Sequence, residues 1–526
     1  MSETVNASLK TAAKGTAFVF IGMIATNALW FVTRLLVVRH LSREDLGIYT
    51  LGVAIVSIVS MLASLGLWEG STRYISVFLG QGRGKDADAV QRASLRIGAI
   101  AGVAACAGIF ILADVLSRHV FYKPELAVPL MVISFFIPAY VMTLILASVL
   151  RGRGSIGPKV YFMDIGQPFL FLVLLCLIFL LGLSFMSVIY AYVLSMAGAF
   201  VLTALYGLSR NRISPFALGG GGTHVRELLK FSVPLLSVDV MLLVFRWADT
   251  LMLGRYGTVG EVGVYSVGIS LAVLLTLPLF ALEAVYMPIA GDLYAKDRLP
   301  ELARTYQVLT KWVFSVTLPV FFILFFFPEM TITFLFGDRF GDAVLPLRIL
   351  SLGYLFTAFM GANSVLLLVF GLSNAVMKIA TAGTFLNVLL NYIFIKHLGL
   401  GMTGASLATS LSLTSVSFGY SFMLYRHCGI HPVASGCLKP AAGSAVIGVI
   451  IYAAAKSLPL YFWMLPLYFI LYVGGYLVSL ILTRSIDFQD VFLFGEVLKR
   501  AGVTPSVTQN IMSRISRGNL GKTDVS

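Results

Sequence analysis

Long apolar stretches separated by short polar links recur along the chain from Gly15 to Thr483. A helix needs roughly 20 apolar residues to cross the hydrocarbon core of a bilayer, and these stretches reach that length. No link between them is long enough to fold as a separate domain. The pattern therefore predicts an all-α polytopic membrane protein with about fourteen transmembrane helices. The helices are expected at residues 15–38, 46–68, 94–116, 127–150, 158–182, 187–209, 231–254, 262–287, 307–328, 344–369, 376–396, 403–425, 440–456 and 461–483.

Composition leaves little room for a soluble protein. Of the 526 residues, 58% are hydrophobic and only 12% are charged, and the mean hydropathy is +0.92. The net charge of +14 would suit a nucleic-acid-binding protein, but the basic residues are spread over short links between apolar helices. We therefore expect no nucleic-acid partner.

The basic residues also predict the orientation in the membrane. With an even number of spans both termini lie on one side, and Lys and Arg are roughly threefold more numerous on that side. Cytoplasmic links carry the excess of positive charge in membrane proteins. We therefore predict a multi-pass protein of the cell (plasma or inner) membrane with both termini in the cytoplasm.

An internal repeat divides the chain into halves. Asp45-Leu46-Gly47-Ile48-Tyr49-x-x-Gly52 recurs 216 residues later as Glu261-Val262-Gly263-Val264-Tyr265-x-x-Gly268. Each copy falls at the link between the first and second predicted helix of its half. Because the period covers an even number of spans, the halves share one orientation, as in transporters built from parallel repeats.

Four parts follow from the repeat. Residues 1–215 are expected to form an N-terminal six-helix lobe and residues 216–437 a C-terminal six-helix lobe. Residues 438–483 add a helix pair, and residues 484–526 form a basic cytoplasmic tail. The run Gly219-Gly220-Gly221-Gly222 is typical of a flexible linker between the lobes.

Ionisable residues inside the predicted spans are few. An arginine at the bilayer centre costs roughly 2.5–3.5 kcal/mol on insertion scales, so it is retained where it faces a watery cavity or a partner. The first predicted helix carries Arg34, with Asn27 two turns earlier on the same face. The seventh, its counterpart in the second half, carries Asp239, Arg246 and Asp249. We expect both polar stripes to line a cavity between the lobes.

Simpler interpretations of these residues stay open. Arg246 and Asp249 are three residues apart and could neutralise each other, while Arg34 could extend to the outer headgroups. Arg39 and Arg255 are further candidates for a cationic substrate site, although basic residues that flank spans often only set topology. Glu283, deep in the eighth predicted helix, is a candidate for ion coupling.

Metal and catalytic chemistry have little support in the sequence. Cys428, Cys437, His427 and His431 share one short link, but their spacing matches no standard zinc site. No spacing indicates a nucleophilic triad or a catalytic pair of carboxylates. We therefore expect no metal site, no catalytic residue and no enzyme.

A series of motifs, spread along the chain in a fixed order, resembles one transporter family. They are Arg34-Leu35-Leu36, Arg39-x-Leu41-Ser42-Arg43-Glu44-Asp45-Leu46-Gly47-Ile48-Tyr49, Ser64-Leu65-Gly66-Leu67 with Arg73-Tyr74-Ile75, Ala248-Asp249-x-x-Met252-Leu253-Gly254, Phe336-Gly337-Asp338-x-Phe340 with Pro346-Leu347-Arg348-Ile349-Leu350, and Gly404-Ala405-x-Leu407-Ala408-Thr409. Together they resemble the polysaccharide-transport family of oligosaccharide-lipid flippases, in the multidrug/oligosaccharidyl-lipid/polysaccharide exporter superfamily. The likeness covers roughly residues 15–483 and rests on the order of the motifs, since none is decisive alone.

The resemblance implies a V-shaped pair of six-helix bundles that opens alternately to either side. It also implies a cationic central cavity for the phosphate-bearing head of a lipid-linked oligosaccharide, with Arg34 and Arg246 as the matching cations. The two extra C-terminal helices would form a groove for the lipid tail. The expected partners are this substrate, membrane lipids and other glycan-assembly proteins. No cofactor is expected, and coupling to H⁺ or Na⁺ through Asp249 or Glu283 stays open.

Other functions compete with this one. A peptidoglycan-precursor flippase and a multidrug antiporter belong to the same superfamily, although drug–sodium antiporters usually have twelve helices and a more acidic binding region. A membrane glycan polymerase or ligase would need a sizeable outer loop, and the longest predicted outer links, near 114–128 and 329–343, have only about fifteen residues. A membrane scaffold that keeps the fold without transport is a further alternative.

Overall fold

The computed structural model describes residues 22, 25–210, 224–431, 438–456 and 462–483. Within these ranges the regular structure is helical and contains no strand. Eleven of the described helical segments are long and apolar enough to cross a membrane. They are Arg43–Gly80, Gly84–Val120, Pro124–Gly152, Lys159–Leu181, Phe185–Ser209, Val225–Tyr256, Val259–Ala295, Leu299–Phe326, Asp338–Val369, Ser373–His397 and Gly401–Cys428. The all-α polytopic membrane fold is thereby confirmed.

The predicted count of fourteen spans is not confirmed. The first predicted span lies partly outside the described residues, and its described part is helical over residues 25–40. The last two correspond to shorter apolar helices, Lys439–Ala455 and Leu465–Leu480. The predicted linker Gly219–Gly222 and the predicted tail 484–526 lie outside the described residues.

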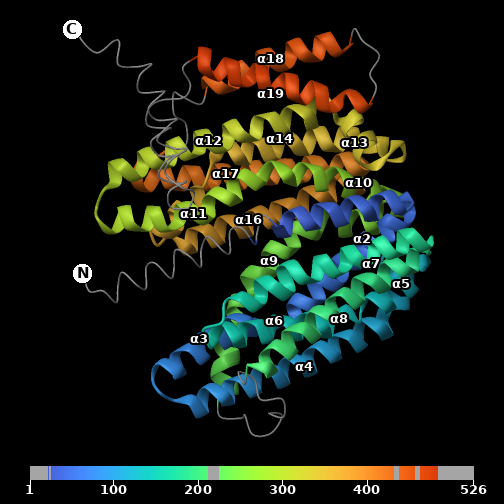
Figure 1. Ribbon diagram of the computed structural model, residues 1–526, viewed down its shortest axis with the longest axis vertical. Helices are drawn as coiled ribbons and strands as arrows, with labels where there is room; N and C mark the ends of the chain where they lie inside the picture. Colours follow the sequence, from blue (N-terminus) through green and yellow to red (C-terminus); the bar gives the residue numbers. More distant parts are fainter. Residues whose placement is uncertain (1–21, 23–24, 211–223, 432–437, 457–461, 484–526) are drawn as a thin grey trace.

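Two bundles of helices lie side by side (Figure 1). The first contains helical residues 25–40, α2 (Arg43–Ala63), α3 (Leu67–Gly80), α4 (Gly84–Val115), η1 (Leu116–Val120), η2 (Pro124–Leu126), α5 (Ala127–Ile133), α6 (Phe136–Gly152), η3 (Lys159–Gly166), α7 (Gln167–Leu181) and α8 (Phe185–Ser209). The second contains α9 (Val225–Tyr256), α10 (Val259–Ala272), η4 (Val273–Thr276), α11 (Leu277–Ala295), α12 (Leu299–Phe326), α13 (Pro328–Phe336), η5 (Asp338–Ala343), α14 (Val344–Met360), α15 (Asn363–Val369), α16 (Ser373–Asn391), η6 (Tyr392–His397) and α17 (Gly401–Cys428). We call them the N-terminal and C-terminal lobes.

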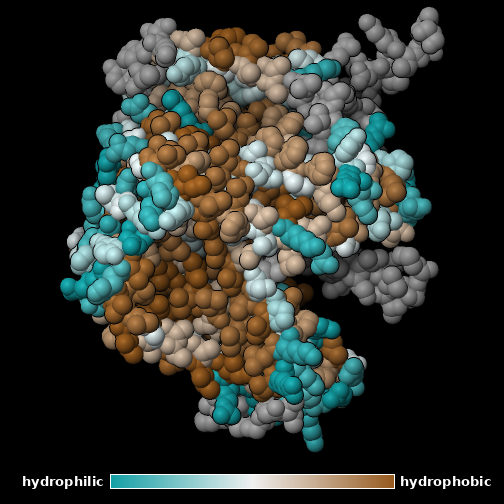
Figure 2. Space-filling view, turned by 180° about the vertical axis from the view of Figure 1, so that it is seen from behind, coloured by the Kyte–Doolittle hydropathy of each residue, from teal (hydrophilic) through white to brown (hydrophobic). Residues whose placement is uncertain are grey.

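An apolar belt covers the face of the molecule shown in Figure 2. Hydrophobic residues fill the middle of this face across both lobes, and hydrophilic residues gather toward its two sides, where the helices end. Exposed Leu, Val, Ile and Phe side chains are expected where lipid rather than water surrounds a protein. The belt therefore has the character of a surface that faces a bilayer.

The two copies of the sequence repeat begin α2 and α10 with the same kind of helix cap. Ser42 caps α2, where its hydroxyl accepts from the backbone N–H of Asp45 at 3.0 Å. Thr258 caps α10, where its hydroxyl accepts from the backbone N–H of Glu261 at 3.1 Å. A hydroxyl at the cap with an acidic residue three positions later satisfies backbone donors at a helix start. The acidic residue of the repeat is thus explained by helix capping.

The glycines of the repeat bring α2 and α10 together across the two lobes. A Cβ atom on Gly47 would lie 1.9 Å from the carbonyl oxygen of Val259, and one on Gly263 would lie 2.1 Å from the carbonyl oxygen of Arg43. Only glycine permits such an approach between backbones. The repeat therefore encodes a close contact between the lobes.

Helix α9 joins the lobes, because its first turns pack on α3 of the N-terminal lobe and later turns on α16 of the C-terminal lobe. The contact with α3 is close: Cβ atoms on Gly66 and Gly70 would lie 2.3 Å and 2.1 Å from the carbonyl and hydroxyl oxygens of Ser232. Pro234 follows inside the helix. Because proline removes a backbone hydrogen bond, α9 has a natural point of bending just after this contact.

The last two described helices, α18 (Leu438–Lys456) and α19 (Leu465–Leu482), lie at the edge of the C-terminal lobe, and the short η8 (Phe462–Met464) directly precedes α19 (Figure 1). Aromatic rings fill their contact with α12. Phe322 stacks on Tyr472 with centroids 3.8 Å apart, and Phe327, the residue directly after α12, stacks on Tyr468 at 5.3 Å. Tyr472 also hydrogen-bonds to Ser444. The pair is thus fixed to the C-terminal lobe.

Candidate functional site

Arg34 projects from the first described helix toward the C-terminal lobe. Its guanidinium donates to the hydroxyl of Ser266 on α10 at 2.5 Å. Its Nε is buried and has no hydrogen-bond partner among the described residues. A charged donor left unmatched away from water is costly unless a ligand satisfies it. The contact with Ser266 crosses between the lobes and places Arg34 at their interface.

Arg246, the second arginine candidate, lies on α9, the helix that joins the lobes. Its side chain is exposed and its guanidinium sits 6.0 Å from the ring centre of Trp247. It interacts electrostatically with Tyr192 of α8 and with Tyr354 of α14, which belong to different lobes. The electrostatic influence of Arg246 thus extends to tyrosines of both lobes.

Tyrosine rings connect the surroundings of the two arginines. Tyr49 interacts electrostatically with Arg34, and its ring packs edge-on against Tyr192 with centroids 5.8 Å apart. Tyr192 in turn interacts with Arg246. Neither arginine forms an ion pair with a residue in the described part of the chain. Two cations lacking acidic partners therefore share one neighbourhood.

Asp249 lies inside the C-terminal lobe rather than beside Arg246. It is 1% exposed and accepts hydrogen bonds from Tyr265 of α10 and Thr409 of α17. Asn391 and Asn387 of α16 donate to its other oxygen at 2.6 Å and 3.4 Å. All four donors are uncharged, so Asp249 does not simply neutralise Arg246.

One oxygen beside this carboxylate is left unmatched. The side-chain oxygen of Asn391 is buried and has no hydrogen-bond partner among the described residues. Buried polar atoms are almost always paired. A carboxylate, an unmatched amide oxygen and the hydroxyl of Thr409 together form an oxygen-lined place that suits a small cation or a proton.

The other candidates have neighbours of their own among the described residues. Asp239 on α9 interacts electrostatically with Glu69 of α3. Glu283 on α11 accepts a hydrogen bond from Ser364 of α15 at 3.4 Å and interacts with Tyr420 of α17. Asn27 is exposed on the first described helix, two turns before Arg34.

Arg39 contacts the end of a helix in the opposite lobe. It donates to the carbonyl oxygens of Phe334 and Leu335, near the end of α13, at 2.8 Å and 2.6 Å. Arg339 donates in return to the carbonyl oxygens of Arg39 and Leu41, where the first helix ends, at 2.6 Å and 3.0 Å. The last carbonyls of a helix lack helical partners and carry partial negative charge, which arginine satisfies. Arg39 thus holds the lobes together at one end.

Arg255 is engaged at the same end of the molecule. Its guanidinium lies 4.3 Å from the ring centre of Tyr122 and 5.2 Å from that of Tyr256. Cation–π contacts of this kind account for its position between the two lobes without a ligand.

The residues around Asp249 were missed in the sequence, although signals for them existed. Asn387 and Asn391 are four residues apart in a predicted span, and therefore on one helix face. Tyr265 belongs to the repeat, and Thr409 ends one of the motifs of the family resemblance. Only the fold brings these side chains, from three helices, to one carboxylate.

Of the four potential zinc ligands near residue 430, Cys437 lies outside the described residues. Among the residues that the structure does describe, no three His, Cys, Asp or Glu side chains come together as a metal site would require.

Comparison with known families gives two matches. The sequence model of the polysaccharide biosynthesis protein family matches residues 12–293, which is more than half of the chain, and that of the MatE family matches residues 234–393. A curated relative, an uncharacterized membrane protein of Methanocaldococcus jannaschii, is 26% identical over 144 residues. That match spans 27% of this chain and 27% of the relative.

Solved structures show the same fold. The lipid II flippase MurJ in an inward closed conformation matches with a TM-score of 0.70 at 16% identity, over 89% of this chain and 99% of that one. An inward-facing multidrug resistance MATE transporter matches at 0.66 and 19% identity, over 77% and 98%. An outward-facing MATE transporter matches at 0.54 and 19% identity, over 79% and 95%. The likeness is thus greater to the inward conformations.

Proposed function

The chain belongs to the polysaccharide biosynthesis protein family, and we propose that it is a flippase for a lipid-linked oligosaccharide. Family and fold make it a multi-pass membrane protein of a transporter superfamily that includes MATE proteins and MurJ. The proposed cargo is a glycan joined through phosphate or pyrophosphate to a polyprenyl or dolichyl carrier. It would move from the inner to the outer leaflet of the cell membrane for assembly of a surface polysaccharide or glycan.

The proposal is supported by two arginines that lack acidic partners among the described residues: Arg34, which contacts α10, and Arg246 on α9. Arginine stays charged and binds phosphate oxygens through two parallel hydrogen bonds. The unmatched Nε of Arg34 supplies a donor for such an oxygen, and Arg246 supplies a second cation without an acidic partner among the described residues. A phosphate-bearing head would provide the negative charge that this neighbourhood lacks.

Transport follows from the different solubilities of the two ends of the substrate. The glycan and its phosphate cannot cross hydrocarbon unassisted, whereas the lipid tail can stay in it. The head would enter between the lobes from the cytoplasmic side, and the lobes would then close inside and open outside. Outward movement of an anionic head runs with an inside-negative potential, which contributes roughly 2.3 kcal/mol per charge per 100 mV.

A cation at Asp249 would reset the empty carrier. Sodium is a hard cation that takes oxygen ligands, and the Asp249 carboxylate, the Thr409 hydroxyl and the unmatched side-chain oxygen of Asn391 supply oxygens inside the C-terminal lobe. A proton on the carboxylate would serve the same purpose. Glu283, half-buried and hydrogen-bonded to Ser364, is the second candidate for this coupling.

Replacement of both arginines tests the proposed cargo site. The variant Arg34→Gln with Arg246→Gln, at equal protein level, is expected to lower flipping of a polyprenyl-pyrophosphate-linked oligosaccharide in proteoliposomes at least tenfold. Each hydrogen bond from a charged donor contributes about 1.5–3 kcal/mol, which supports a loss of that size. Arg118→Gln, which removes an exposed pair with Asp114, is the matched control. Unchanged flipping in the double variant would end the proposal.

A peptidoglycan-precursor flippase is the second candidate, because MurJ covers more of this chain than the MATE structure does, 89% against 77%. The same proteoliposomes separate the two candidates. Movement of lipid II with no movement of other lipid-linked glycans would favour the second.

A further inference from the structure

We propose that Tyr265 and Ser266, consecutive residues of α10, connect the cation site at Asp249 with the phosphate site at Arg34. A cation bound at Asp249 controls the hydrogen bond between Ser266 and Arg34. Through this bond it controls the affinity of the carrier for a phosphate-bearing head. The inference rests on the proposed function and adds to it the element that makes the two sites depend on each other.

Ser266 fixes Arg34 from the opposite lobe. The Ser266 hydroxyl donates to the carbonyl oxygen of Gly263 at 2.6 Å, so its lone pairs are free to accept from Arg34 at 2.5 Å. Ser266 is 3% exposed, which leaves its hydroxyl little freedom to turn. It therefore acts as a positioning residue, since it sets where the guanidinium lies without itself contacting the substrate.

Tyr265, the preceding residue, reaches the other site. Its hydroxyl donates to the Asp249 carboxylate, and the whole side chain is buried. Consecutive side chains on an α-helix point about 100° apart. One turn of α10 thus presents a hydroxyl to Asp249 within its own lobe and a second hydroxyl to Arg34 in the other lobe.

Tight packing of α10 couples the contact of Tyr265 with Asp249 to the contact of Ser266 with Arg34. Gly263 lies at the close crossing with α2, where even a methyl group would collide with the backbone at Arg43. A helix held this tightly moves as a unit between discrete arrangements rather than bending gradually. A shift of Tyr265 must therefore displace Ser266.

Whether the cation weakens or strengthens phosphate binding follows from its competition with Tyr265 for an oxygen of Asp249. A cation at Asp249 takes the oxygen that now accepts from Tyr265, so the Tyr265 hydroxyl has to turn away. The movement of α10 withdraws Ser266 from Arg34 and weakens phosphate binding, so that cation and head exchange rather than bind together. A purely electrostatic link would act the other way, because a nearby cation attracts phosphate.

Binding of farnesyl pyrophosphate to the full-length protein in nanodiscs tests the inference. The Kd is measured with 100 mM Na⁺ and with Na⁺ replaced by N-methylglucamine. For the unchanged protein, Na⁺ is expected to raise the Kd at least fivefold, the lower range of known coupling between sites. Ser266→Ala and Tyr265→Phe are each expected to reduce this Na⁺ effect to less than twofold. Ser270→Ala, one turn later on the same helix, removes a hydroxyl that donates to the carbonyl oxygen of Ser266, and should retain it.

The outcomes separate this inference from the proposed function. The inference is overturned if binding depends on Arg34 but Na⁺ changes the Kd equally in Ser266→Ala and in the unchanged protein. That result would not contradict the proposed function. A Kd that Na⁺ leaves unchanged or lowers in the unchanged protein also overturns the inference. Absence of binding to the unchanged protein would overturn both. Because coupling is reciprocal, ²²Na⁺ binding in the same samples must weaken by the same factor when farnesyl pyrophosphate is added.

Discussion

Single glycines set how closely the lobes approach. Gly263→Ala would place a methyl group 2.1 Å from the carbonyl oxygen of Arg43, which cannot move aside without shifting α2. Overpacking of this kind costs about 1–3 kcal/mol. We expect the thermal unfolding temperature of the purified protein to fall by several degrees. Gly108→Ala on α4, where no atom lies within 4 Å of the new methyl group, should leave it unchanged or raise it. Equal behaviour of the two variants would contradict this account of the crossing.

Only the charged residues of the candidate site could be predicted from the sequence. Arg34, Arg246 and Asp249 stand out because ionisable groups inside apolar helices are costly. The uncharged residues that complete the sites, such as Ser266 and Asn391, carry no comparable signal, since serine and asparagine are common in membrane helices for packing and capping. Distance along the chain hides them further: Arg34 and Ser266 are separated by 232 residues.

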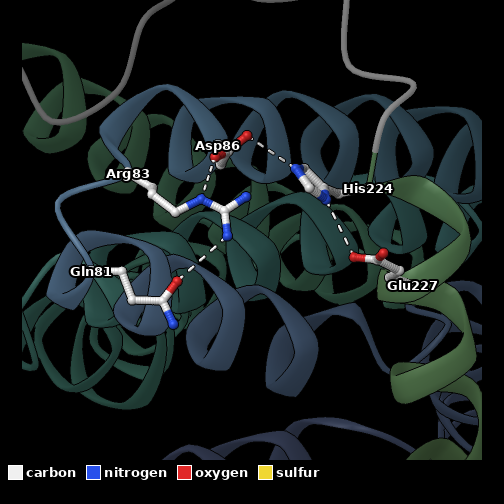
Figure 3. A network of polar contacts seen from close by, with 5 residues as sticks. All are labelled: Gln81, Arg83, Asp86, His224 and Glu227. Carbon is white, nitrogen blue, oxygen red and sulfur yellow. Dashed lines mark hydrogen bonds and ion pairs between the residues drawn. The ribbon is translucent and has the colours of Figure 1, made fainter.

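Among the helices, α9 is shared between the lobes, and polar contacts hold its start to the N-terminal lobe (Figure 3). The ring nitrogens of His224 lie 3.1 Å from the carboxylate of Asp86 on α4 and 3.3 Å from that of Glu227. Arg83 donates to Asp86 at 2.8 Å. Asp86 thus bridges the start of α9 to the α3–α4 link, on the side where the charge asymmetry predicts the cytoplasm.

Asp86→Asn is expected to loosen the first turns of α9 without unfolding the protein. The amide loses the charge that pairs with both His224 and Arg83, so hydrogen exchange at residues 228–233 should become roughly threefold faster through local opening. Asp292→Asn breaks an exposed pair with Lys296 inside a single helix and serves as control. If exchange in α9 is the same in both variants, Asp86 does not hold this helix to the N-terminal lobe.

Most helices could be predicted from hydrophobicity, but their ends and breaks could not. The predicted span 344–369 is two helices, α14 and α15, separated at Gly361, whose φ is +67° and whose Cβ would lie 2.2 Å from the Thr310 hydroxyl. The apolar pattern does not record this contact, because it depends on a neighbouring helix. Likewise α3 extends to Gly80, beyond the predicted end at residue 68, since helices continue past the hydrocarbon that hydrophobicity reports.

In the molecule as a whole, the repeat predicted two lobes, and the structure adds how they close. Arg39, Arg43, Arg339 and Asp342 form what we call the outer clasp, at the end that the charge asymmetry predicts to be extracytoplasmic. Arg43 pairs with Asp342 at 2.5 Å and donates to the carbonyl oxygen of Arg339. A carrier that releases cargo outside has to break the clasp in every cycle.

Weakening the outer clasp should therefore shift the lobes toward an outward-open arrangement. Arg339→Gln removes two hydrogen bonds from a charged donor to carbonyls at a helix end, each contributing about 1.5–3 kcal/mol. Spin labels at the exposed positions Val128 and Leu345, one on each lobe near this end, are expected to report a several-fold larger population at long distance. Arg298→Gln, which breaks an exposed pair with Glu301, should leave that distribution unchanged.

Reversing the charges of the Arg43–Asp342 pair tests the same prediction more strictly. Asp342→Arg sets two arginines against each other across the lobes and should populate the long distance as Arg339→Gln does, because like charges repel where the pair now holds at 2.5 Å. Adding Arg43→Asp restores an opposite pair in reversed order and should return the distribution toward that of the unchanged protein. Recovery is expected to be partial, since Arg43 also donates to the carbonyl oxygen of Arg339 and aspartate cannot. A double variant as open as Asp342→Arg alone would mean that the pair does not hold the lobes together.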